Sequence, residues 1–127
     1  MIGFKDAVSL FYSRYTDFAG RSSRAEYWWF MLFFIIATFV VAFIAGILGE
    51  TIGTIVIAIW YLAHLVGLVA LGIRRLHDTD RSGWWYLLTF VPIASLVLLV
   101  FFVLPGTQGP NKYGPDPYGA GTAETFS

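Results

Sequence analysis

Three long stretches without a charged residue constrain the fold of this 127-residue chain more than any other feature. No Asp, Glu, Lys or Arg lies between Glu26 and Glu50, between Glu50 and Arg74, or between Arg81 and Lys112. A helix on the surface of a soluble protein keeps polar residues along its outer face. These stretches are apolar on every side, so they require lipid or neighbouring helices around them.

The charge-free stretches predict three transmembrane helices, over residues 27–48, 51–73 and 83–104. With 22 or 23 residues at 1.5 Å each, every helix reaches roughly 33 to 35 Å, which crosses a hydrocarbon core of about 30 Å. The composition agrees, because 57% of the residues are hydrophobic and 13% are charged, against about 25% charged in soluble domains. We therefore expect an all-α integral membrane protein, with residues 1–127 forming a single membrane domain.

The composition also excludes several classes of function. Eight basic residues are balanced by eight acidic ones, so the chain lacks the high net charge of a disordered protein and the basic excess of a nucleic-acid-binding one. The absence of cysteine removes disulfides, cysteine-based zinc sites and thiol catalysis. The sequence holds no phosphate-binding loop and no nucleophile with an adjacent base. We therefore expect neither an enzyme nor a bound cofactor or metal.

Residues 4–15 predict an amphipathic helix before the first span. Its apolar side carries Phe4, Val8, Phe11, Tyr12 and Tyr15. Such a helix lies in the membrane interface, here on the cytoplasmic leaflet. A helix packed on the protein's own cytoplasmic loops explains the pattern equally well. Ser23 and Glu26 then have the spacing of a capping box, which marks the start of the first long helix.

Glycine and proline indicate where the spans turn and bend. Gly46, Gly49 and Gly53 permit a tight reversal between the first two spans and a close approach of their helices. Pro92 has no backbone N–H, so it predicts a kink in the third span near Leu88.

The distribution of Lys and Arg predicts the orientation. Seven of these eight residues lie before the first span or between the second and third, and the remaining one, Lys112, lies in the tail. Short loops rich in Lys and Arg stay in the cytoplasm, so we expect a cytoplasmic N-terminus. Three crossings then place the irregular tail, residues 105–127, outside.

A polar residue of each predicted span falls at a similar depth, and these residues are Thr38, His64 and Ser95. Counted from the inner end of each span, the three lie roughly 14 to 16 Å deep. An ionisable residue within a span suggests a functional site, so His64 is a candidate proton or ion relay. Alternatively, its neutral imidazole joins helices by a hydrogen bond to Thr38 or Ser95, which suits a histidine without an acidic partner better.

A charged cluster is expected on the cytoplasmic side, where the N-terminal segment meets the loop after the second span. Its members are Arg21, Arg24, Glu26, Arg74, Arg75, His77, Asp78 and Arg81. We expect Glu26 to pair with Arg74 or Arg75. Asp78 is expected to pair with Arg21 or Arg24. Exposed ion pairs of this kind contribute little stability, so they would set the register of the two loops.

Other uses of this cluster are less favoured. Arginines bind lipid phosphates well, but the interleaved carboxylates reduce the positive charge available here. His77, Asp78 and Asp80 could contribute to a metal site, but no second His or Cys lies in reach of the loop.

Three separated segments carry a resemblance to a known family. They read FAGRSSRAEYWWF at 18–30, RRLHDTDRSGWW at 74–85 and PGTQGPNKYGPDP at 105–117. They resemble the YhaH-like family of bacterial inner-membrane proteins, domain of unknown function 805, over nearly the whole chain. The resemblance implies a small polytopic protein of the bacterial cytoplasmic membrane with no established activity. The chain departs from the family at Asp80, where a glycine normally stands.

These observations favour an interaction or assembly component of the inner membrane. We expect its partners to be membrane lipid and either further copies of itself or other membrane proteins. The alternative is a small transporter or channel subunit whose oligomer uses His64. A third class is a membrane enzyme that uses His77 and Asp78 at the inner interface.

Overall fold

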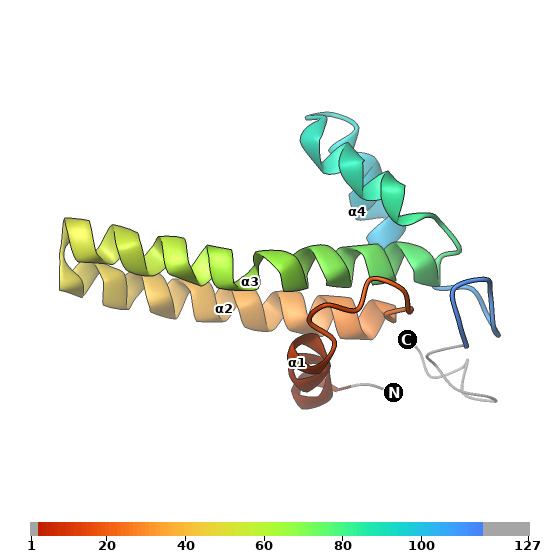
Figure 1. Ribbon diagram of the computed structural model, residues 1–127, viewed down its shortest axis with the longest axis horizontal. Coiled ribbons are helices and arrows are strands. Elements are labelled where there is room, and N and C mark those ends of the chain that lie inside the picture. The colour runs from red at the N-terminus through yellow and green to blue at the C-terminus, as the bar shows by residue number, and fades with distance from the viewer. Residues whose placement is uncertain (1–2, 116–127) are drawn as a thin grey trace.

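Two long antiparallel helices form the axis of the structure (Figure 1). The computed structural model describes residues 3–115, and in it α2 spans Arg24–Leu48 and α3 spans Glu50–Asp78. Both helices are long and apolar enough to cross a membrane, in agreement with the first two predicted spans. Because α3 continues five residues beyond the predicted end at Ile73, Arg74 and Arg75 lie on the helix rather than in a loop.

Local chemistry explains where these helices begin and turn. The Ser23 hydroxyl caps α2 by accepting the backbone N–H of Glu26 at 3.0 Å, which is one half of the predicted capping box. Gly49 separates the two helices with φ +100°, a conformation that glycine adopts at no steric cost. One turn later, a Cβ at Gly53 would lie 2.3 Å from the Ala45 carbonyl oxygen, so the close approach of the helices requires glycine there.

The N-terminal helix, α1 (Phe4–Ser13), packs across the two long helices rather than on cytoplasmic loops (Figure 1). Phe11 is buried and stacks on Phe30 of α2, with 3.7 Å between the ring centroids. On α3, a Cβ at Gly67 would lie 2.5 Å from the Phe11 ring. The amphipathic pattern therefore reflects a protein contact, while Phe4 and Tyr12 stay 42% and 46% exposed.

The third charge-free stretch differs from its prediction. Residues 83–104 form a short helical hairpin instead of one continuous helix: η1, a 3₁₀ helix over Gly83–Phe90, is followed by a turn and by α4 over Ser95–Val103. Pro92 cannot donate to the Leu88 carbonyl, which instead accepts the N–H of Val91 at 3.0 Å. The chain thus reverses where a kink was expected. Eight 3₁₀ residues and nine α residues reach only about 16 and 14 Å, so neither helix can cross a bilayer alone.

The tail packs against the end of α3. After α4 the chain returns to the end of α3, where the backbone N–H of Thr107 donates to the Asp78 carbonyl at 2.7 Å. Residues 105–115 are irregular, as expected, but they lie at the same end of the long helices as the N-terminal segment. A tail on the opposite side of a membrane from the N-terminal segment would require a third crossing, and residues 83–104 form a hairpin instead. Residues 116–127 of the predicted tail lie outside the described residues.

We predict that Gly53→Ala destabilises the protein by about 1 to 3 kcal/mol, because its methyl group would overlap the Ala45 carbonyl. Gly46→Ala is the matched control on the facing helix, since a Cβ there meets nothing within 4 Å. Thermal unfolding of the purified protein in detergent measures the difference. Equal melting temperatures for the two variants would contradict the close contact.

Candidate functional site

Three arginines are buried at the end of α3 and beside it. Arg74 and Arg75 have no exposed surface, and Arg21 from the N-terminal segment is 4% exposed. Charged side chains are almost never fully buried unless they are paired. Glu26 and Asp78 supply the carboxylates, each about as deeply buried. We call these five residues the arginine cluster.

One half of the cluster centres on Asp78. Its Oδ1 accepts the Arg21 Nε–H at 3.0 Å, and its Oδ2 accepts an Nη1–H of Arg75 at 2.9 Å. A single carboxylate therefore bridges two guanidinium groups, one from the N-terminal segment and one from its own helix.

Backbone carbonyls complete the pairing of these two arginines. The acceptors belong to the end of the helical hairpin and to the tail, and they are Phe102, Leu104, Thr107, Gly109 and Gly114. Arg75 binds the first two, at 3.1 Å for Phe102, while Arg21 binds the last three, at 2.6, 2.8 and 3.4 Å. The cluster thus ties the hairpin and the tail to the end of α3.

The other half of the cluster centres on Arg74. Its Nε–H donates to the Ser22 hydroxyl at 2.7 Å, and its Nη2 lies 3.4 Å from a carboxylate oxygen of Glu26. Its Nη1 donates to the carbonyls of Arg14 and Asp17 at 2.8 and 2.9 Å. The segment between α1 and α2 is therefore wrapped around one side chain of α3.

Two ion pairs match the expected partners, Glu26 with Arg74 and Asp78 with Arg21. Arg75 pairs with Asp78 instead of Glu26. The pairs are buried rather than exposed, because α3 extends to Asp78 and the tail covers them. Sequence reasoning missed the carbonyl acceptors, although a tail rich in Gly and Pro offers carbonyls that no helix uses.

The remaining candidates of the charged segment lie around the cluster. Arg24 donates to the Val103 carbonyl at 2.9 Å, and the Arg81 guanidinium lies 4.0 Å from the centre of the Phe101 ring. These contacts hold the base of the helical hairpin.

His77 contacts a backbone carbonyl and an aromatic ring. Its Nδ1 lies 3.0 Å from the Gly20 carbonyl and its ring stacks on Tyr113, with 3.9 Å between centroids. Within residues 3–115, no three His, Asp or Glu side chains gather as a metal site would require.

Asp80 adopts the left-handed backbone conformation that glycine accepts most readily. Its φ is +62°, and the backbone N–H groups of Asp80 and Arg81 donate to the carbonyls of His77 and Leu76, both at 2.9 Å. This is the Schellman pattern that ends helices with a left-handed residue. Aspartate tolerates that conformation better than most residues, so the turn keeps its geometry.

The predicted polar layer forms only in part. The Trp60 indole N–H donates to the Thr38 hydroxyl at 2.9 Å, which joins α3 to α2. Ser95 instead donates to the Pro92 carbonyl within the turn of the hairpin. His64 contacts neither Thr38 nor Ser95 through a hydrogen bond of its own.

His64 is bonded at both ring nitrogens. Its Nδ1–H donates to the Trp60 carbonyl at 2.9 Å, because a carbonyl can only accept, and its Nε2 lies 2.9 Å from the Tyr12 hydroxyl of α1. Burial, together with Tyr15, raises the pKa of the Tyr12 hydroxyl, so Tyr12 stays protonated and donates. The sequence showed Tyr12 only as part of an apolar face.

Long apolar helices and an internally paired cluster at one end define a small helical membrane protein. The chain belongs to the family described as "Protein of unknown function (DUF805)", which matches residues 15–115.

Relatives in Escherichia coli (strain K12) agree with this assignment. The chain is 50% identical to inner membrane protein YhaI, over 81% of this chain and 87% of the relative. It is 42% identical to inner membrane protein YhaH, over 81% and 88%, and 32% identical to the uncharacterized protein YiiR, over 79% and 85%. No solved structure matches.

We predict that Asp78→Asn lowers the free energy of unfolding by about 3 kcal/mol or more, because it leaves two buried guanidinium groups without their carboxylate. Asp80→Asn is the control two residues away, since that side chain is exposed and asparagine accepts its left-handed backbone. Thermal unfolding followed by circular dichroism distinguishes them. If both variants have the melting temperature of the wild type, the arginine cluster does not stabilise the folded protein.

Proposed function

We propose that this protein is a non-enzymatic assembly component of the bacterial inner membrane, which receives a helix of a second copy or of another membrane protein. A groove of about 280 Å³ between α2 and α3 carries the proposal. It lies near their connection and is lined by Ala42, Ala45, Gly46, Gly49, Glu50, Gly53, Thr54 and Ile57. Small residues let a second helix approach closely, which is how helices associate in lipid.

The chemistry of the polar groups supports a role without catalysis. Within residues 3–115, every buried side-chain nitrogen and oxygen has a hydrogen-bond partner. His64 is engaged by Tyr12 and by the backbone, and His77 by the Gly20 carbonyl. Neither the relay through His64 nor the enzyme using His77 finds support in this geometry.

The proposed arrangement in the membrane has two crossings, α2 and α3, with residues 83–104 entering and leaving the cytoplasmic leaflet. The return of the tail to the arginine cluster supports it. All eight Lys and Arg residues then lie on the cluster side, whereas the connection at Gly49 carries none. By the positive-inside rule, the N-terminal segment and the tail are both cytoplasmic.

Single cysteines test this arrangement, because the chain has none of its own. Glu50→Cys and Gln108→Cys both replace exposed residues, at opposite ends of the long helices. With a membrane-impermeant maleimide, position 50 should react in intact spheroplasts and position 108 only after the membrane is permeabilised. Labelling of position 108 from outside would instead restore three crossings.

Photocrosslinking tests assembly. Phe43→p-benzoylphenylalanine, at a side chain that is 71% exposed, should form a protein adduct in native membranes. Gly46→Leu in the same chain fills the groove and should abolish the adduct. Phe30→p-benzoylphenylalanine is the buried control. If position 43 captures only lipid, the chain does not assemble through this face.

A further inference from the structure

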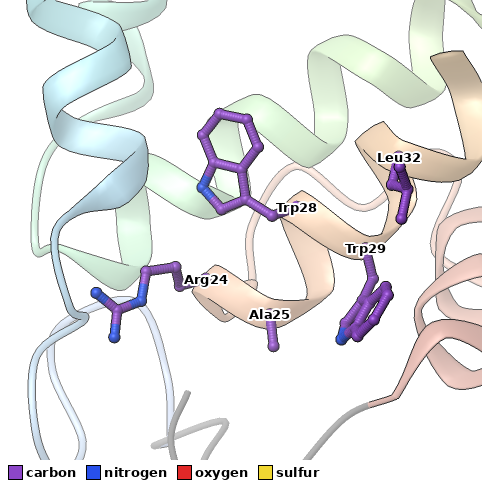
Figure 2. Close-up of a pocket in the computed structure, with 5 residues that line it drawn as sticks. All are labelled: Arg24, Ala25, Trp28, Trp29 and Leu32. Atoms are coloured by element: carbon purple, nitrogen blue, oxygen red, sulfur yellow. The ribbon is translucent and has the colours of Figure 1, made fainter.

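A second groove lies on the outer face of α2, near the arginine cluster but outside it. It has a volume of about 380 Å³ and is lined by Arg24, Ala25, Trp28, Trp29 and Leu32. Figure 2 shows the Arg24 side chain extending past the start of the helix, the two indoles diverging to either side, and Leu32 farther along. We call it the tryptophan groove.

The walls of the tryptophan groove are held in place by neighbouring elements. The Trp28 indole N–H donates to the Phe102 carbonyl at the end of α4, at 3.0 Å. Trp29 meets the Phe4 ring of α1 edge to face, with 6.0 Å between centroids. Ala25 lies about one helical turn before the two indoles on α2 and contributes only a methyl group. The groove is therefore preformed.

The order of its residues follows the depth profile of a lipid monolayer. Arg24 places a positive charge at one end, where its guanidinium also binds the Val103 carbonyl. Indoles prefer the interface between headgroups and hydrocarbon, and Leu32 belongs in the acyl region. Arg24 and Leu32 are eight positions apart, which corresponds to about 12 Å along the helix.

We propose that the tryptophan groove binds one anionic phospholipid, with the phosphate at Arg24 and an acyl chain along Ala25, Trp28, Trp29 and Leu32. Charge complementarity identifies the occupant: arginine binds phosphate oxygens through parallel N–H groups, and basic pockets beside transmembrane helices bind anionic headgroups on the cytoplasmic side. Arg21, Arg74 and Arg75 are less accessible to a headgroup, because each is at most 4% exposed. The inference rests on the proposed membrane placement but not on assembly with a partner.

Native mass spectrometry of the purified full chain tests the site. The protein is extracted from nanodiscs of phosphatidylcholine with one-fifth phosphatidylglycerol, and the lipids retained per chain are counted. The wild type should keep one phosphatidylglycerol. Arg24→Gln should weaken its retention about tenfold, whereas Lys112→Gln, which removes an exposed charge of the tail, should not change it.

A second variant keeps the charge and closes the groove. Ala25→Leu should weaken retention of phosphatidylglycerol at an unchanged melting temperature, so a folding defect of Arg24→Gln would not decide the result. If both Arg24→Gln and Ala25→Leu retain the lipid as the wild type does, the assigned site is wrong. Equal retention of phosphatidylcholine would overturn the recognition of charge.

Two further experiments distinguish a bound lipid from a small anion and from a protein partner. Inorganic phosphate at the concentration of phosphatidylglycerol should not displace it; displacement would assign the site to a small anion. Leu32→p-benzoylphenylalanine should capture lipid in native membranes, and capture of a protein would overturn the proposal. Because lipid binding is measured on the isolated chain, failure of the assembly proposal at position 43 leaves this result unaffected.

Discussion

Buried guanidinium groups determine the arrangement of this protein outside its two long helices. Arginine cannot lose its charge inside a protein, so each buried guanidinium requires carboxylates or carbonyl oxygens around it. Arg21, Arg74 and Arg75 obtain these acceptors from the segment before α2, from α3 itself, from the end of α4 and from the tail. Four segments that are distant in sequence meet for this reason.

The long helices were predictable because length and the absence of charge are local properties. The Ser23 cap and the pairing of Glu26 with Arg74 also followed from spacing and charge. The end of α3 was not predicted from the sequence, because the charged residues within 74–78 suggested a loop. Once α3 continues through them, the helix carries its own charges into a buried site.

The stretch over residues 83–104 shows what hydropathy cannot reveal. It is about as long and as apolar as the other two predicted spans, yet it reverses at Pro92. A distant contact also holds the hairpin in place, because Arg75 binds the carbonyls of Phe102 and Leu104 at the end of α3. The hydrogen bond between Tyr12 and His64 could not be predicted from the sequence either, because it forms only when α1 packs across the long helices.

The arginine cluster also sets an order of completion during biosynthesis. Arg21 leaves the ribosome 86 residues before Thr107, 88 before Gly109 and 93 before Gly114, and it binds the carbonyl groups of all three. The pair α2 and α3 can enter the bilayer while these acceptors are still unmade. The end that carries the arginine cluster therefore closes last, and a nascent chain halted before position 107 has its helices in place but an Arg21 that lacks all three carbonyls.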